Sequence, residues 1–228
     1  AVIYVPEGNS VEKNAAMEAF GAELVVHGRD FDEAAAECQR AAADQGLHMV
    51  PSFDPLLVKG VATYGLEFFR SAPDLDVVYV PIGMGSGICG MMAARDALGL
   101  TTEIVGVVSE GAPAVALSFE AGRIIPTNEA RTFADGMACR QPHPDALQRM
   151  AGGVARMIRV SDDAIADAIR AYYEDTHHMA EGAGAAPLAA LLSERDRLQG
   201  RKAGVVLSGG NIDRPLYASV LAGETPAG

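Results

Sequence analysis

The chain has 228 residues, of which 49% are hydrophobic and 21% charged, and its formal net charge is −12 at pH 7. This composition indicates a soluble α/β protein with enough apolar residues for one large domain or two small ones. The charge is spread out without a basic stripe, and no apolar run approaches the roughly 20 residues that span a bilayer, which argues against nucleic-acid and membrane partners. Cys38, Cys89 and Cys139 form no CxxC pair, which favours a cytoplasmic location and argues against a zinc site.

The N-terminal part alternates short apolar runs with stretches of helical period. In chain order we predict Val2–Val5 (strand), Val11–Phe20 (helix), Ala22–His27 (strand), Asp30–Ala43 (helix) and Leu47–Val50 (strand). Asp30 and Glu33 have the spacing of a capping box at the start of the second helix. The turn Ser52–Pro55 is the predicted domain boundary, which gives one domain over residues 1–55 and another over residues 56–228.

The C-terminal part continues the alternation. In chain order we predict Val58–Arg70 (helix), Val77–Ile82 (strand), Ser86–Leu98 (helix), Glu103–Val108 (strand), Asp162–Thr176 (helix), Gly182–Leu192 (helix) and Gly204–Leu207 (strand). Continuous apolar strands separated by helices predict an α/β fold with parallel sheets, right-handed crossovers and helices on both faces. Ligands of such sheets bind at the carboxyl ends of the strands.

A glycine-rich loop follows the strand Val77–Ile82 and leads directly into a helix. The loop reads Gly83-Met84-Gly85-Ser86-Gly87-Ile88-Cys89-Gly90. A strand, a glycine loop and a helix start present main-chain N–H groups and the positive end of a helix to a phosphate group. Gly85, Gly87 and Gly90 also satisfy GxGxxG, with Glu110 near the end of the next strand, so a dinucleotide is an alternative ligand. A tight turn without any ligand is the other alternative.

A second glycine loop follows the last predicted strand. It reads Ser208-Gly209-Gly210-Asn211-Ile212-Asp213 and places a hydroxyl group at the carboxyl end of its strand. Two such loops can face one crevice. A phosphate cradle on one strand and a lone hydroxyl on another suit a ligand that has a phosphate at one end and a weakly basic ring nitrogen at the other.

These loops, in this order, resemble those of fold-type II (tryptophan synthase beta-like) pyridoxal-phosphate enzymes, specifically the serine/threonine dehydratases and serine racemases. The resemblance covers essentially the whole chain. Further matching segments are Val5-Pro6-Glu7, Lys13, Phe20–Val25, Phe31–Ala34, Pro51–Asp54, Gly106-Val107, Gly111–Ala114, Ala134–Gly136 and Glu181–Ala185. The resemblance implies a two-domain protein, in which residues 1–55 are the remainder of the small domain and residues 56–228 are the large cofactor-binding domain.

The resemblance also implies the cofactor, pyridoxal 5'-phosphate, and the residues that hold it. Main-chain N–H groups of Gly83, Met84, Gly85, Ser86 and Gly87 would bind its phosphate. Met84 must direct its side chain away from the phosphate, whereas Ser86 could add a hydroxyl.

Two further residues are implied at the ring of the cofactor. Ser208 would hydrogen-bond the pyridine nitrogen, and because a hydroxyl does not protonate that nitrogen as a carboxylate would, β-elimination is favoured. Glu181 would lie beside the ring; its alternative role is that of an acid at a helix N-terminus. Racemases of the family have a carboxylate metal site after the Gly106 strand, but Val108 and Ala114 stand at those positions, so we expect no divalent metal there.

The lysine that forms a Schiff base with the cofactor is absent from the sequence given. The family carries it in a Ser-x-Lys-x-Arg-Gly run, and the three lysines of this chain, Lys13, Lys59 and Lys202, stand in other contexts and are interpreted as exposed charges. The resemblance therefore implies that the first third of the enzyme, and with it the catalytic lysine, lies outside these residues. The chain alone is expected to be inactive.

The implied activity is that of a dehydratase or ammonia-lyase, which converts a β-hydroxy amino acid to a 2-oxo acid and ammonia. Threonine, serine and a 3-hydroxy acidic amino acid are the candidate substrates, and a homodimer or homotetramer is expected. A racemase or β-replacement synthase is the alternative within the family, and a non-catalytic phosphate- or dinucleotide-binding module is the alternative outside it. His177 and His178 are interpreted as solvated or capping residues, and Cys89 as a packed thiol.

Overall fold

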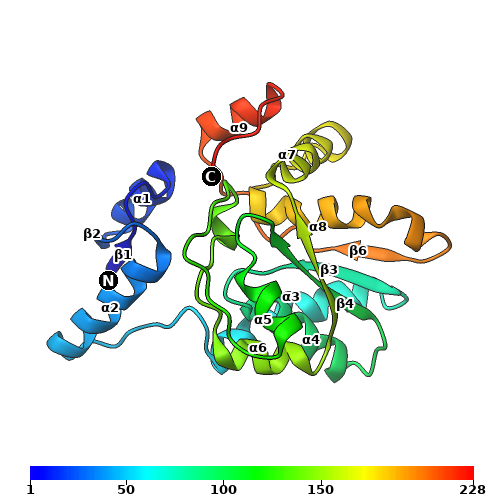
Figure 1. The fold of residues 1–228 in the computed structure, drawn as a ribbon, viewed down its shortest axis with the longest axis horizontal. Coiled ribbons are helices and arrows are strands. Elements are labelled where there is room, and N and C mark those ends of the chain that lie inside the picture. The colour runs from blue at the N-terminus through cyan, green and yellow to red at the C-terminus, as the bar shows by residue number, and fades with distance from the viewer. The chain divides into compact units, whose positions relative to one another are not determined.

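The computed structural model describes residues 1–228, which form two compact units (Figure 1). The smaller unit comprises Ala1–Pro51 and Asn211–Ala218, and the larger unit comprises Ser52–Gly210 and Ser219–Gly228. These units differ from the predicted domains in two places, because Ser52–Pro55 belongs to the larger unit and a C-terminal segment belongs to the smaller one. None of the helices combines the length and the apolarity needed to cross a bilayer.

The smaller unit is built on two parallel strands. β1 (Val2–Val5) pairs with β2 (Glu23–Val26), and α1 (Val11–Ala19) connects them. α2 (Phe31–Gln45) then packs against β1 and ends at Gly46, whose φ of 66° is in the left-handed region that favours glycine.

Half of the predicted capping box of α2 forms. The Asp30 carboxylate accepts a hydrogen bond from the Glu33 amide at 3.1 Å. The Glu33 carboxylate does not complete the box and accepts instead from the Arg29 amide at 3.0 Å, next to the Arg29 guanidinium.

The predicted strand Leu47–Val50 is wrong. These residues form no ladder with another strand, and Leu47 and Val50 are 51% and 81% exposed. A short apolar run becomes a strand only where a neighbouring strand accepts its hydrogen bonds. Here the run lies between the left-handed Gly46 and Pro51, which has no amide hydrogen to donate.

The start of α1 is held by a carboxylate from the other end of the sequence. Asp213 accepts from the Ser10 hydroxyl at 2.5 Å and from the amides of Val11 and Glu12 at 3.1 and 3.3 Å. The hydrogen bond from Ser10 is the main reason why the pKa of Asp213 lies below its usual value of 3.8. Asp213 therefore fastens the C-terminal segment of the smaller unit to the positive end of α1.

We expect Asp213→Asn to loosen α1 by about 1 kcal/mol, because a helix cap and its charge contribute that much. The protection of the α1 amides against hydrogen exchange measures the effect. Asp44→Asn, in an exposed ion pair with Arg40 at the end of α2, is the matched control and should change little. Since the folded pKa of Asp213 is lowered, its contribution is complete above pH 3.8 and is lost as the pH falls through the folded value. Equal protection in both variants would contradict this assignment.

The larger unit is a four-stranded parallel sheet between two layers of helices (Figure 1). The strand order is β5-β4-β3-β6, with bounds β3 (Val77–Pro81), β4 (Glu103–Ser109), β5 (Val154–Val160) and β6 (Ala203–Val205). α3 to α6 lie on one side of the sheet, and α7 and α8 on the other, with α8 packed across all four strands. The helix bounds of this unit are α3 (Pro55–Ser71), α4 (Ser86–Ala97), α5 (Ala114–Ala121), α6 (Pro144–Ala151), α7 (Asp162–Ala171) and α8 (Gly182–Ser193). The last helix, α9 (Arg214–Leu221), is divided between the two units after Ala218.

The order of the strands creates a switch point beside β3. From β3 the chain proceeds through β4 to β5 on one side, and then returns through α7 and α8 to β6 on the other side of β3. The connections that leave β3 and reach β6 therefore cover opposite faces of the sheet. In open parallel sheets a crevice forms at this place, outside the carboxyl ends of the two strands. The two glycine loops follow β3 and β6, so both lie at this crevice.

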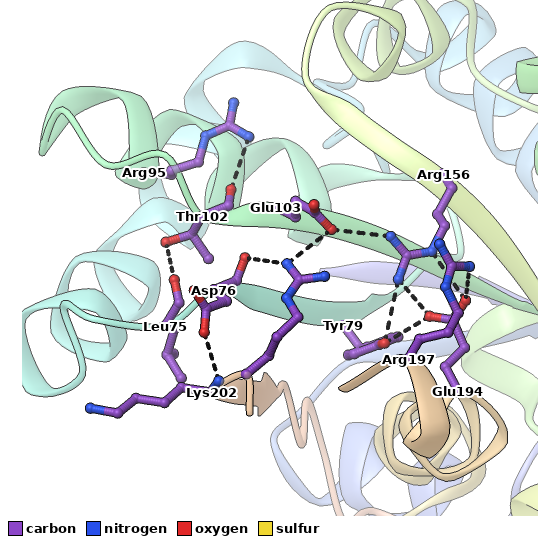
Figure 2. Close-up of polar contacts among 11 residues, drawn as sticks. Leu75, Asp76, Tyr79, Arg95, Thr102, Glu103, Arg156, Glu194, Arg197 and Lys202 are labelled. Atoms are coloured by element: carbon purple, nitrogen blue, oxygen red, sulfur yellow. Dashed lines mark hydrogen bonds and ion pairs between the residues drawn. The ribbon is translucent and has the colours of Figure 1, made fainter. Parts of the chain in front are cut away.

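A network of partly buried charges lies towards the other, amino end of the sheet (Figure 2). Arg156, on β5, donates to Glu194 at the end of α8, to Glu103 at 3.2 Å and to the Tyr79 hydroxyl at 3.4 Å. β5 has no clear strand pattern in the sequence, because Arg156 and Arg159 interrupt its apolar residues. The carboxylates of Glu103 and Glu194 pair with the partly buried Arg156, and both are distant from it in the sequence.

Candidate functional site

The glycine loop after β3 turns tightly into α4. Gly85 precedes the first residue of α4 with φ 96°, a conformation that residues with a side chain rarely adopt. Gly83 lies so close to the loop at 134–137 that an added Cβ would stand 2.4 Å from the Gly136 carbonyl oxygen. The first turn of α4 leaves its N–H groups without partners inside the helix, so this end of α4 can bind an anion.

An open pocket lies beside this loop. Its lining residues come from α3, β3, both glycine loops, the loop at 134–137 and the start of α8; they are Tyr64, Val80, Pro81, Gly83, Gly87, Gly136, Glu181, Ala183 and Ser208. The structure thus brings together Gly83, Gly87, Glu181 and Ser208 of the predicted cofactor residues. It also brings in Tyr64 and Gly136, which the sequence analysis did not select.

The other predicted residues of the loop, Met84, Gly85 and Ser86, do not line the pocket. Met84 directs its sulfur to within 3.5 Å of the Cys139 sulfur, as expected for a side chain that leaves the anion site open. A Cβ at Gly85 would stand 3.0 Å from the Ala146 Cβ on α6. Ser86 is the first residue of α4 and is not among the residues that line the pocket.

The second glycine loop packs against the start of α8. The Glu181 amide donates to the Gly209 carbonyl at 3.1 Å. A Cβ on Gly209 would stand 2.6 Å from the Glu181 carboxylate, so glycine is needed for this close approach. Glu181 is therefore both the residue that precedes α8 and a residue of the pocket wall, and the two interpretations of its carboxylate are compatible.

Tyr64 contributes the phenolic hydroxyl of the pocket. It lies on α3, and its hydroxyl donates to the Gly87 carbonyl at 3.4 Å. Burial raises the pKa of Tyr64 to about 12. The helical spacing of α3 places Tyr64 on a partly buried face, but nothing local in the sequence says that this face meets the glycine loop.

Several other candidate residues lie away from the pocket. Glu110, the predicted ribose ligand, is exposed and does not line the pocket. Gly90 packs against α3, where an added Cβ would stand 3.0 Å from the Ala62 amide. Burial raises the pKa of the Cys89 thiol to about 11, which fits a packed thiol, and His177 and His178 are exposed. Lys13, Lys59 and Lys202 do not line the pocket either.

Comparison with known proteins decides between the ligands. The model of the family described as "Pyridoxal-phosphate dependent enzyme" matches residues 1–209. The chain belongs to this family. Its relatives include the L-threonine ammonia-lyase of Geobacter sulfurreducens, 38% identical over 93% of this chain, and the catabolic L-threonine dehydratase TdcB of Escherichia coli, 34% identical over 92%. The chain spans about half the length of the first relative, 53%, and 65% of the second.

Solved structures of pyridoxal-phosphate enzymes share the fold. The processed threonine deaminase isoform 2 of Solanum lycopersicum superposes with a TM-score of 0.89 at 29% identity, over 98% of this chain and 67% of that one. Maize serine racemase gives a TM-score of 0.87 at 26% identity, over 98% of this chain and 69% of that one. The predicted α/β fold of type II is therefore confirmed.

The pocket fits pyridoxal phosphate. The glycine loop with the start of α4 supplies uncharged donors for a phosphate. Ser208 supplies a hydroxyl that can hydrogen-bond a ring nitrogen without ionising it. The glycine cradle on one strand and the hydroxyl on another thus open into one pocket.

Proposed function

We propose that the protein that carries this chain is a pyridoxal-phosphate-dependent ammonia-lyase that converts a β-hydroxy amino acid to a 2-oxo acid and ammonia. One observation carries the proposal: the phosphate cradle of Gly83 and Gly87 and the hydroxyl of Ser208 line a single pocket. The relatives named threonine ammonia-lyase and threonine dehydratase support this reaction. Threonine, serine and a 3-hydroxy acidic amino acid remain the candidate substrates.

Each residue of the pocket has a distinct part in this proposal. When bound, the cofactor supplies an electron sink for the bonds at the amino acid's α-carbon. Main-chain N–H groups from Gly83 to Gly87 would hold its phosphate, and the Ser208 hydroxyl would hydrogen-bond the ring nitrogen without protonating it. Such a hydrogen bond would favour loss of the β-hydroxyl over other fates of the substrate. Glu181 fixes the Gly209 backbone, and through it the position of Ser208.

The α-proton needs a base, and we propose that it is a lysine outside residues 1–228. Lys13, Lys59 and Lys202 do not line the pocket, and Lys202 is paired with Asp74. The part of the relatives' length that this chain does not span leaves room for such a residue. The cytoplasmic location and the homodimer or homotetramer also belong to the proposal; three free cysteines support the former.

Product analysis tests the proposed reaction. The full-length protein, supplied with pyridoxal phosphate, should release equal amounts of 2-oxo acid and ammonia from at least one of threonine, serine and 3-hydroxyaspartate. Inversion of the amino acid without ammonia release would favour the racemase that maize serine racemase suggests. Cofactor binding without any turnover would favour a non-catalytic binding module.

A further inference from the structure

The Tyr64 hydroxyl stands next to the first turn of α4. Gly87 is the second residue of α4, and the position of an added Cβ on Gly87 lies 3.6 Å from this hydroxyl. Gly87 has no side chain that would stand next to the tyrosine oxygen, and both residues line the pocket.

The packing of α3 on α4 fixes this hydroxyl. Gly65, the next residue of α3, is buried so closely that an added Cβ would stand 2.9 Å from the Ala94 Cβ on α4. Two helices in such close contact move together, because a packed interface has little free volume. The distance between the Tyr64 hydroxyl and the start of α4 is thus set by the fold.

The Tyr64 hydroxyl retains its proton and makes only a long hydrogen bond. Because burial raises the pKa of Tyr64 to about 12, the group is neutral at physiological pH and can donate a hydrogen bond. Its contact with the Gly87 carbonyl is 3.4 Å long, whereas hydroxyl hydrogen bonds are shortest near about 2.7 Å. A partly buried donor with such a long contact gains from a better acceptor in the pocket.

We propose that the Tyr64 hydroxyl is a side-chain donor to the phosphate of the cofactor, in addition to the main-chain donors of the glycine loop. The inference rests on the proposed cofactor site. The phosphate is the acceptor because Tyr64 borders the first turn of α4, where an anion is stabilised. An uncharged donor suits this place, since it adds a hydrogen bond to the anion without requiring the burial of a second charge.

Binding of pyridoxal phosphate and of pyridoxal, which lacks the phosphate, to the full-length protein tests the proposal. Tyr64→Phe should weaken pyridoxal phosphate about ten- to hundredfold, the value of one hydrogen bond to a charged group, and leave pyridoxal unchanged. The ³¹P resonance of the bound cofactor should shift in the same variant. Tyr172→Phe is the matched control, because the Tyr172 hydroxyl is buried without a hydrogen-bond partner and its pKa is also raised to about 12.

The outcomes separate this inference from the proposed function. Equal affinity of the wild-type protein and Tyr64→Phe for pyridoxal phosphate, with an unshifted ³¹P resonance, would overturn the inference and leave the cofactor site standing. Equal weakening of pyridoxal and pyridoxal phosphate would also overturn it, since the hydroxyl would then act on the ring or on the fold. No binding of pyridoxal phosphate by the wild-type protein would overturn the proposed function itself.

Discussion

Replacing Gly83 by alanine is expected to lower the affinity of the full-length protein for pyridoxal phosphate about ten- to hundredfold. The new methyl group would stand 2.4 Å from the Gly136 carbonyl oxygen, which belongs to the backbone and cannot rotate away. The loop after β3 or the loop at 134–137 must therefore shift, and the loss of one hydrogen bond to a charged group costs about ten- to hundredfold in affinity. A titration that follows the absorbance of the cofactor measures the change.

Gly60→Ala is the matched control for this experiment. Gly60 lies inside α3, an added Cβ on it meets nothing within 4 Å, and its φ is not positive. Alanine is preferred to glycine in a helix by about 1 kcal/mol, so the control should be slightly more stable and should bind the cofactor normally. Circular dichroism should show that both variants are folded. Normal binding by Gly83→Ala would mean that the phosphate does not lie at this loop.

Local patterns predicted most of the sheet and the two loops of the site. The sequence predicts the strand Val77–Pro81 and the helix after Gly83–Gly85, because an apolar run, a glycine turn and a helical period follow one another directly. Ser208 is predicted in the same way, because a glycine turn directly follows its apolar run. Each of these features depends on residues that are neighbours in the sequence.

Features that depend on distant residues were not predictable in this way. β5 contains Arg156, which is tolerated there only because Glu103 and Glu194 reach it from other elements. Tyr64 reaches the pocket only because α3 packs on α4. Leu47–Val50 shows the converse, since its apolar run lacks the neighbouring strand that would make it a strand. Pairing and burial, which no local pattern contains, decided all three cases.

Glu194→Gln is expected to lower the free energy of unfolding by about 2 kcal/mol, because it weakens the charged hydrogen bonds that the Glu194 carboxylate accepts from Arg156 and Tyr79. The Glu194 side chain is 12% exposed and accepts from the Tyr79 hydroxyl at 2.7 Å and from Arg156 (Figure 2). The variant would leave the Arg156 guanidinium with Glu103 as its carboxylate partner. Urea unfolding measures the loss. Arg197→Gln is the control; it also removes a partner of Glu194, but one that is 65% exposed, so it should cost less than about 1 kcal/mol.

The pH dependence of stability distinguishes the charge of Glu194 from its packing. Burial raises the pKa of this carboxyl, but the hydrogen bonds from Arg156 and Tyr79 outweigh burial and bring the pKa below its usual value of 4.5. The charge therefore stabilises the fold fully above pH 4.5 and progressively less as the pH falls through the folded pKa. The free energies of unfolding of the wild-type protein and Glu194→Gln should converge at acidic pH. A difference that does not change with pH would mean that packing, and not charge, causes the effect. Because this network lies towards the amino ends of the strands, Glu194→Gln should leave the cofactor affinity at neutral pH unchanged. Gly83→Ala, by contrast, is expected to lower that affinity.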